Sequence, residues 1–297
     1  MANSSGHVKE GQWSLKSLLP MDDTELVRWQ ALIEKRTGMN LPAERKVFLQ
    51  TSLGIRMREI GCSSYQDYYD MVARGPKAMV EWTILVDRLT VQETRFFRDA
   101  DAFNLVKDYL CTRPPEQLTR KSIEIWSVGC STGEEPYTLA MMIEETLASL
   151  QLKGYYGITG TDISFPALAK ARGAIYPARK LVTLSQERKE KYFEQLSANE
   201  FAVVPRLKER VCFSRVNVLE LKDAPMHGMD IIFCQNLLIY FKRWRRKEIL
   251  NRLAERLVPG GLLVLGQGEI VDWKNPLLQR IPSDNTLAFI RHIERDN

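Results

Sequence analysis

The chain has 297 residues, of which 44% are hydrophobic and 27% are charged, and its formal net charge is +5. This composition is typical of a soluble globular protein and excludes a disordered or fibrous one. The charge is compatible with an acidic partner but is too small to indicate a dedicated nucleic-acid binder. A chain of this length predicts one main domain with a large core and a smaller second domain.

The start of the chain is polar and contains no apolar signal core, and no segment approaches the roughly 18 uninterrupted apolar residues of a membrane span. We therefore expect a cytoplasmic protein. The three histidines show no H-x-x-x-H spacing, so we expect no metal site. The cysteines form no C-x-x-C pair and predict reduced, mostly buried thiols at Cys62, Cys111, Cys130, Cys212 and Cys234.

The first third of the chain carries helical periodicity. Apolar residues recur on one helix face at Leu26, Trp29, Leu32 and Ile33. After a break at 37–42, further helices are expected around 47–57, 65–72 and 79–89. We expect a flexible segment over 1–20 and a helical N-terminal domain over 21–111.

A polar stretch with prolines at 112–121 predicts a linker. From residue 122 to 297, short apolar runs typical of buried strands alternate with helical patterns. This alternation predicts crossover connections and a doubly wound, mostly parallel sheet, which is the α/β fold class. The alternation lapses over about 177–213, where a helix and short strands predict a small inserted subdomain.

The segment 123–136, IEIWSVGCSTGEEP, predicts a buried strand that runs into a tight turn and then into a helix. Gly129 and Gly133 permit a sharp turn and a close approach to a ligand, and the helix N-terminus offers unpaired N–H groups. We interpret this turn as a ligand-binding loop, although a strand-to-helix turn without a ligand has the same pattern.

Asp162 ends the next predicted strand, where an acidic residue can accept hydrogen bonds from two ribose hydroxyls. Its alternative role is the N-cap of the following helix. Glu134 and Glu135 in the loop disfavour a pyrophosphate and favour the cationic sulfonium and amino groups of S-adenosylmethionine. The sequence leaves open which of these two glutamates faces the cofactor.

The segment 229–241, MDIIFCQNLLIYF, predicts a strand that ends at Cys234 and brings Gln235, Asn236 and Tyr240 to the carboxyl edge of the sheet. Ligands of open α/β folds bind at that edge. Tyr240 is placed to cover a sulfonium methyl, or it packs as an ordinary aromatic side chain.

In their order and spacing, these segments resemble the chemotaxis receptor protein-glutamate O-methyltransferase family, CheR type, over nearly the whole chain. The matching stretches are 90–103, 125–137, 161–176, 217–220, 231–241 and 260–269. The resemblance implies a helical N-terminal domain, a Rossmann-like methyltransferase domain with a small inserted antiparallel β subdomain, and S-adenosylmethionine as cofactor. It also implies the cytoplasmic methylation helices of a chemoreceptor as partner. The sequence leaves the oligomeric state open, with a monomer as the default. Overall similarity further indicates the type IV pilus chemosensory members of the family.

The resemblance implies which residues form the site. Those near the cofactor would be Gln92, Thr94, Arg98, Gly129, Glu134, Glu135, Asp162, Asn217, Val218, Gln235 and Asn236, and those nearest the reaction would be Arg98 and Tyr240. The chain departs from the family at Gln92, Gln235 and 267–268, where Asn, Arg and a His–Ser pair are usual. The Gln235 departure removes a positive charge near the cofactor.

A glutamate with a pKa of about 4.3 is already ionised at neutral pH, so its methylation requires no general base. Arg98 is suited to orient such a carboxylate, because a guanidinium holds it in a forked contact. The basic run 242–247 beside Tyr240 is either a surface for acidic receptor helices or a solvated helix face. The same two interpretations apply to Lys46, Arg56 and Arg58.

Other functions fit parts of the sequence. GCSTG matches the nucleophile elbow of α/β hydrolases, with Ser131 as nucleophile and with Asp272 and His292 downstream, but the helical first third and the missing oxyanion segment oppose it. A cofactor-binding module with weakened catalysis is a second alternative. A nucleic-acid methyltransferase is a third, and it lacks the D/N-P-P-Y/F signature.

Overall fold

The structure is a computed structural model that describes residues 20–90, 93–283 and 285–293. The predicted flexible segment 1–20, except Pro20, and the predicted site residue Gln92 lie outside the described residues. Within the described part of the chain, no helix is long and apolar enough to cross a membrane.

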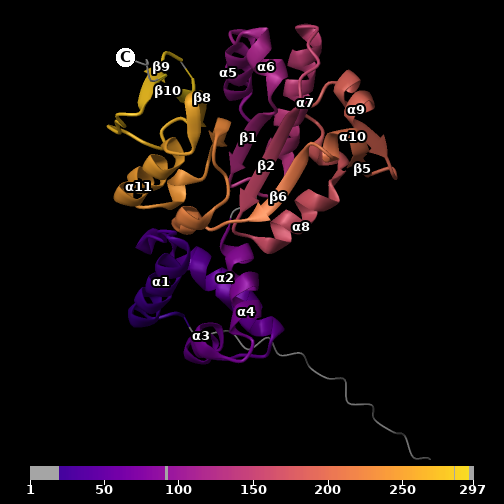
Figure 1. Ribbon diagram of the computed structural model, residues 1–297. Coiled ribbons are helices and arrows are strands. Elements are labelled where there is room, and N and C mark those ends of the chain that lie inside the picture. Colours follow the sequence, from indigo (N-terminus) through magenta and orange to yellow (C-terminus); the bar gives the residue numbers. More distant parts are fainter. Residues whose placement is uncertain (1–19, 91–92, 284, 294–297) are drawn as a thin grey trace, which may run out of the picture.

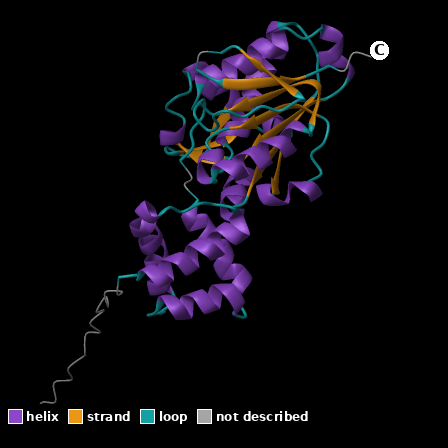
Figure 2. Ribbon diagram, turned by 90° about the vertical axis from the view of Figure 1, so that its left-hand side faces the viewer, coloured by secondary structure: helices purple, strands orange, loops and turns teal. Residues whose placement is uncertain are grey.

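The helical N-terminal domain lies at one end of the molecule, below the sheet in Figure 1 and Figure 2. Its elements are α1 Asp23–Thr37, the 3-10 turn η1 Ala43–Arg45, α2 Lys46–Glu59, α3 Tyr65–Arg74 and α4 Ala78–Leu89. The Asp22 side chain accepts from the Glu25 backbone N–H while the Glu25 side chain accepts from the Asp22 N–H, so a capping box starts α1. The core of the domain buries Trp29, Leu53 and Tyr68 completely or nearly so.

The larger domain contains a seven-stranded sheet in the order β6-β2-β1-β7-β8-β10-β9. The strands are β1 Ile123–Val128, β2 Tyr156–Asp162, β6 Val211–Arg215, β7 Met229–Cys234, β8 Leu257–Leu265, β9 Leu278–Ile281 and β10 Leu287–Arg291. The first five strands in that order pair in parallel, and β10 pairs antiparallel with both β8 and β9. The predicted mostly parallel α/β sheet is therefore confirmed.

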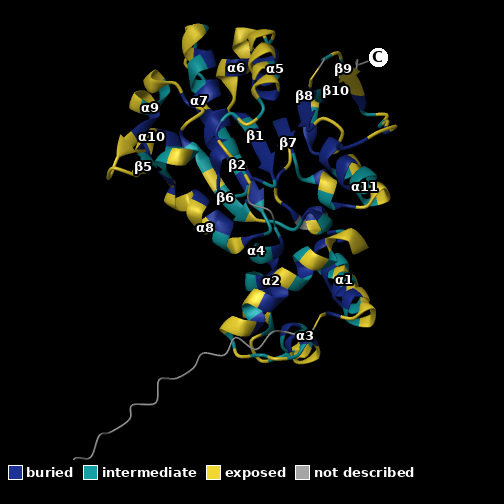
Figure 3. Cartoon of the chain, turned by 180° about the vertical axis from the view of Figure 1, so that it is seen from behind, coloured by how far each residue is buried: buried dark blue, intermediate teal, exposed yellow. Residues whose placement is uncertain are grey.

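Helices cover both faces of this sheet, and Figure 3 shows the buried strands between them. Alternate residues of β7 point to opposite faces, as the period of a strand requires: Phe233 packs with α5 Ala100–Cys111 and α7 Glu134–Ser149, whereas Ile232 packs with α11 Arg243–Ala254. The remaining helical pieces are α6 Pro115–Arg120, α8 Phe165–Gly173, α10 Pro205–Lys208, η3 Val218–Asp223 and η4 Leu238–Tyr240.

A small antiparallel sheet of order β3-β5-β4 confirms the inserted subdomain. It is built from β3 Ile175–Pro177, η2 Ala178–Lys180, α9 Gln186–Tyr192, β4 Phe193–Gln195 and β5 Glu200–Val203. We use the name inserted subdomain for residues 175–203. The predicted range 177–213 was too long at its end, because β6 pairs in parallel with β2 of the main sheet.

The predicted border between the domains needs a correction. Residues 100–111 were assigned to the helical domain, but Phe103, Val106 and Leu110 of α5 lie in one hydrophobic cluster with β1 and α7. The predicted linker 112–121 contains the short helix α6. An amphipathic pattern shows which face of a helix is buried but not which core buries it.

The cysteine prediction is partly wrong. All five thiols are free, but only Cys130 and Cys234 are buried, Cys62 is half-buried, and Cys111 and Cys212 are exposed. The described residues contain no group of three or more His, Cys, Asp or Glu side chains that could hold a metal ion.

Candidate active site between the two domains

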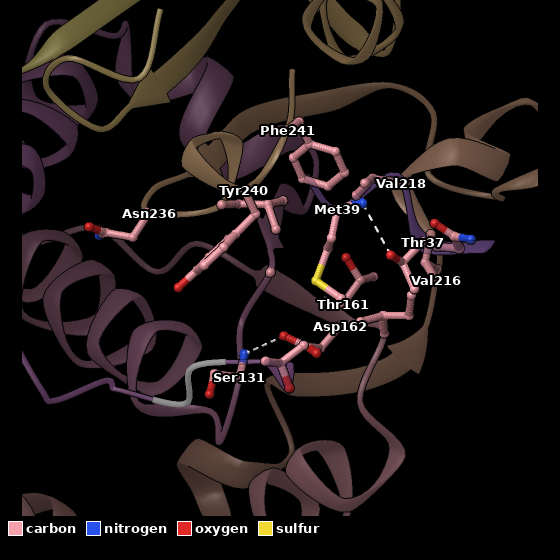
Figure 4. A pocket seen from close by; sticks show the side chains of 15 residues that line it. Thr37, Met39, Ser131, Thr161, Asp162, Val216, Val218, Asn236, Tyr240 and Phe241 are labelled. Carbon is pink, nitrogen blue, oxygen red and sulfur yellow. Dashed lines mark hydrogen bonds between the residues drawn. The ribbon is translucent and has the colours of Figure 1, made fainter. Parts of the chain in front are cut away.

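Two adjoining cavities lie where the carboxyl ends of the parallel strands meet the helical domain. The apolar cavity, drawn in Figure 4, has walls from Met39, Val218, Leu237 and Phe241. The polar cavity is lined by charged and amide side chains, among them Arg45, Arg95, Arg98, Glu135 and Gln235. Gly129, Ser131, Asn236 and Tyr240 line both cavities, so the two form one continuous site.

The loop after β1 forms the floor of the site. Gly129 and Gly133 have φ angles of 78° and 93°, which an L side chain rarely adopts. A Cβ at Gly133 would also lie 2.8 Å from the Cβ of Ala171 and 2.9 Å from the Tyr176 hydroxyl. The Gly133 position thus requires glycine both for backbone conformation and for close packing.

Asp162 lies at the end of β2 and faces the apolar cavity. Its Oδ2 accepts the Ser131 N–H at 2.9 Å, drawn as a dashed line in Figure 4, and its Oδ1 accepts the Ser164 N–H at 2.8 Å. Burial raises the pKa of Asp162, and these backbone donors oppose the shift. Ser164, rather than Asp162, caps α8, since its Oγ accepts the Ala167 N–H. A carboxylate has about four lone-pair sites, so Asp162 can still accept from a ligand.

The structure distinguishes the two neighbouring glutamates of the loop. Glu134 is fully buried and points away from both cavities: its Oε1 lies 2.8 Å from Lys180 Nζ and its Oε2 accepts from Thr132 Oγ1 at 2.6 Å. Glu135 lines the polar cavity and accepts from Ser127 Oγ at 2.7 Å. Burial raises the pKa of Glu135 to about 8.

The other predicted site residues within the described part of the chain also line the two cavities. Asn217 and Val218 line the apolar cavity, and Asn217 Nδ2 donates to the Arg36 carbonyl of the helical domain at 2.9 Å. Thr94 and Arg98 line the polar cavity. Gln235 also donates to Asp99 Oδ2 at 3.0 Å, so the amide that replaces the usual cation has a hydrogen-bond partner.

Tyr240 stands on a turn that is held from two sides, and Figure 4 shows its ring entering the site. Glu269 accepts the Leu238 N–H at 2.8 Å, and its own carboxylate is almost fully buried. Arg246 donates to the carbonyls of Phe241 at 2.8 Å, Glu269 at 2.8 Å and Ile239 at 3.3 Å. Burial raises the pKa of Tyr240, so its hydroxyl stays protonated at neutral pH.

The sequence analysis missed several residues that the structure brings to the site. Thr37, Met39 and Thr90 line the apolar cavity from the helical domain, and Arg45 lines the polar one. Backbone contacts hold this wall in place. Met39 forms an antiparallel β-bridge with Phe241, and the Asn40 N–H donates to the Tyr240 carbonyl at 2.7 Å. Glu269 was within a matching stretch, but its role depends on contacts that no local pattern reveals.

The basic run 242–247 is largely engaged within the protein. Lys242 pairs with Glu34 at 2.7 Å, Arg243 pairs with Asp272 at 3.3 Å, and Arg245 pairs with Glu248 at 2.6 Å. Lys46 and Arg56 of the helical domain are also paired, with Asp23 and Glu81 respectively. These contacts favour the structural interpretation for the basic run and for Lys46 and Arg56, whereas the exposed Arg58 keeps both interpretations.

The geometry opposes a hydrolase triad. Ser131 lies at the carboxyl edge of the parallel strands, whereas His292 follows β10, whose register with β8 places its end at the opposite edge. Asp272 pairs with Arg243. The three side chains therefore do not form one site.

Two family models match the chain. Residues 24–90 match the all-alpha domain of the CheR methyltransferases, and residues 92–287 match their S-adenosylmethionine-binding domain. The border between these matches agrees with the packing of α5 on the sheet.

Chemotaxis protein methyltransferases are similar over most of the chain. One from Borreliella burgdorferi is 30% identical over 83% of this chain and 88% of its own length. One from Escherichia coli is 31% identical over 84% of this chain and 86% of its own length. The chemotaxis protein methyltransferase 1 of Pseudomonas aeruginosa is 32% identical over 84% of this chain and 90% of its own length.

Proposed function

The chain belongs to the CheR methyltransferase family and uses S-adenosylmethionine, and from this premise we propose that it methylates glutamate side chains of a bacterial chemoreceptor. The products would be glutamyl methyl esters and S-adenosylhomocysteine, which makes the enzyme a protein-glutamate O-methyltransferase. The observation that carries the proposal is the placement of two carboxyl groups that can accept hydrogen bonds from the cofactor. Asp162 lines the apolar cavity and Glu135 lines the polar cavity, and Gly129 of the glycine loop lines both.

These residues fit the cofactor chemically. The apolar walls of Met39, Val218 and Phe241 suit a purine ring. Asp162 has lone pairs left for ribose hydroxyls, and Glu135 offers an acceptor to the amino group.

The polar cavity is suited to the acceptor glutamate. When bound, S-adenosylmethionine would supply a sulfonium methyl group that can pass to an ionised carboxylate, with the thioether S-adenosylhomocysteine as the leaving group. Arg98 donates one N–H to the Glu93 carbonyl at 2.6 Å, and its other donors remain to orient the carboxylate. Arg45 and Arg95 add positive charge around the same cavity.

Tyr240 covers the reacting groups and does not act as a base in this proposal. Its raised pKa keeps the phenol neutral, and the substrate carboxylate is ionised without help at its ordinary pKa of about 4.3. The contribution of the protein is therefore positioning and the exclusion of water.

The experiment that tests this function is transfer of radiolabelled methyl from S-adenosylmethionine to membranes that contain the host's chemoreceptors. Carboxyl methyl esters hydrolyse in alkali and N-methyl groups do not, so we expect base-labile label. Arg98→Ala should abolish most of it, while Arg243→Ala, a change in an exposed ion pair, should retain it. Alkali-stable label or no label would contradict the proposal.

We further propose that the enzyme works in the cytoplasm, because its proposed substrate helices are cytoplasmic. We also propose that it is a monomer and that it binds no nucleic acid. The paired state of the basic run supports the last point, because few of its cations are free to contact phosphates. Light scattering of the purified protein would test the monomer.

A further inference from the structure

The segment that carries Arg98 has no regular secondary structure of its own. Residues 93–98 connect the helical domain to α5 and contain neither helix nor strand. The Arg98 guanidinium donates to the Glu93 carbonyl within the same segment. The position of Arg98 therefore depends on whatever fixes this segment.

Side chains of the inserted subdomain hold it, together with Thr138 of α7, whose Oγ1 accepts the Phe97 N–H at 3.2 Å. Lys180 Nζ donates to the Thr94 carbonyl at 2.5 Å, and Thr183 Oγ1 donates to the Phe96 carbonyl at 2.7 Å. Phe96 is fully buried and meets the rings of Tyr176 and Phe193 edge-on, with centroids 5.0 Å and 5.3 Å away. Both partner rings belong to the inserted subdomain.

Lys180 makes a second contact on the side of the cofactor loop. Its ammonium lies 2.8 Å from Oε1 of Glu134, whose side chain is 0% exposed. Glu134 is the first residue of α7, directly after the glycine loop. One ammonium thus joins the inserted subdomain, the cofactor loop and the segment that carries Arg98.

We propose that Lys180 is a positioning residue for methyl transfer, which holds Arg98 in register with the cofactor loop by tying the Thr94 carbonyl and Glu134 together. The inference rests on the proposed function, because it assigns to Arg98 the orientation of the acceptor carboxylate. It gives the inserted subdomain a part in the reaction itself.

The alternative is that Lys180 only neutralises a buried carboxylate. Removal of one partner of a buried ion pair leaves an uncompensated charge and costs stability for that reason alone. The test must therefore remove both charges. In Lys180→Met/Glu134→Gln the buried charge is gone from both sides, whereas the bond to the Thr94 carbonyl is lost; in Glu134→Gln alone that bond remains.

We expect the double variant to melt no lower than Glu134→Gln, which keeps an unpaired ammonium, but to have a kcat about tenfold lower, since small misplacements of a catalytic group cost large factors in rate. Its affinity for S-adenosylmethionine in calorimetry should stay within about threefold, because the apolar cavity is untouched. Lys189→Met serves as the matched control: Lys189 lies in the same subdomain and forms no side-chain hydrogen bond within the described residues.

Hydrogen–deuterium exchange supplies a readout that does not need turnover. We expect the amides of 94–98 to exchange faster in the double variant and in Thr183→Val than in the wild type, and we expect no change in Lys189→Met. Thr183 is exposed, so Thr183→Val should fold, and it should lower kcat in the same direction.

Unchanged exchange at 94–98 together with unchanged kcat in the double variant would overturn the inference while leaving the proposed function intact. A wild-type protein that transfers no methyl group would overturn the proposed function instead. In that case faster exchange would still show the tether but no catalytic role.

Discussion

The backbone N–H of Ser131 donates to Oδ2 of Asp162 at 2.9 Å, so the loop after β1 is tied to the end of β2. This bond makes Asp162 part of the scaffold as well as a proposed ligand for ribose. The two roles can be separated by measuring stability and cofactor affinity on the same variants.

Asp162→Asn should lower both the free energy of unfolding and the affinity for S-adenosylmethionine. The side-chain amide has one oxygen and must turn its NH₂ group toward either the Ser131 or the Ser164 N–H, which leaves a buried donor unpaired and costs about 1–3 kcal/mol of unfolding free energy. We also expect the Kd for S-adenosylmethionine to rise at least about tenfold. Calorimetry and denaturant unfolding measure the two effects.

Asp230→Asn is the matched control for this change. Asp230 accepts the Glu124 N–H at 2.9 Å and is likewise a partly buried carboxylate, but it lies near the start of β7, away from the cavities. Its amide oxygen can still accept the Glu124 N–H, so Asp230→Asn should lose little stability and keep cofactor affinity. An Asp162→Asn protein that binds the cofactor as tightly as Asp230→Asn would contradict the assignment of Asp162.

Met39→Ala tests whether the helical domain completes the cofactor pocket. Met39 is 7% exposed and forms part of the apolar wall. Loss of its contact with the purine should raise the Kd roughly five- to tenfold, with kcat changed much less. Met57→Ala, in the core of the same domain, should destabilise the protein without this effect. Equal affinities of the two variants would mean that the wall does not touch the cofactor.

Much of the sheet and the loop could be predicted because the signals are local. The strand, glycine turn and helix of 123–136 follow directly from backbone preferences, and the alternation of strands and helices specifies a parallel sheet. Asp162 and Tyr240 were placed at the correct edge because Asp162 ends one predicted strand and Tyr240 follows the end of another at Cys234 by a few residues. Their arrival at one site is a consequence of parallel pairing.

The rest depends on tertiary contacts. Met39 is an ordinary apolar residue after a helix, and only the pairing with Phe241 brings it to the site. Glu134 and Glu135 differ by about 100° around one helix, so which one faces the ligand depends on how α7 rests on the sheet. Lys180 was not considered at all, since its partners are 86 residues away at Thr94 and 46 at Glu134.

Arg246→Lys should show that the turn of Tyr240 must be rigid. Arg246 holds three backbone carbonyls with its fork of donors, and a lysine ammonium cannot reproduce that geometry. We expect kcat to fall about tenfold with little change in KM. The neighbouring Arg245→Lys removes only contacts to Glu248 and Trp244 and should behave as wild type. Similar losses in both variants would indicate a general effect of the basic run.

The raised pKa of Glu135 predicts a pH-dependent affinity for S-adenosylmethionine. In the free protein the carboxyl group is neutral below a pKa of about 8, whereas the amino group of the cofactor favours the ionised form. Binding must then release a proton, so the Kd should fall by up to about tenfold for each unit as pH rises toward 8. Calorimetry from about pH 6 to about pH 7.5, in buffers of different ionisation enthalpy, measures both the Kd and the proton release.

The raised pKa of Glu135 also makes the stability of the protein fall as pH rises, whereas the cofactor affinity rises. Because the folded-state pKa of Glu135 lies above its ordinary value of 4.5, its contribution to the unfolding free energy is largest below that value and is lost as pH rises through about 8. Glu135→Gln should therefore bind the cofactor weakly, release no proton on binding, and lose less stability between neutral and alkaline pH. Glu145→Gln, later on α7 and paired with Arg188, should leave the proton release unchanged. Proton release that persists in Glu135→Gln would assign the titration to another group and remove Glu135 from the cofactor contacts.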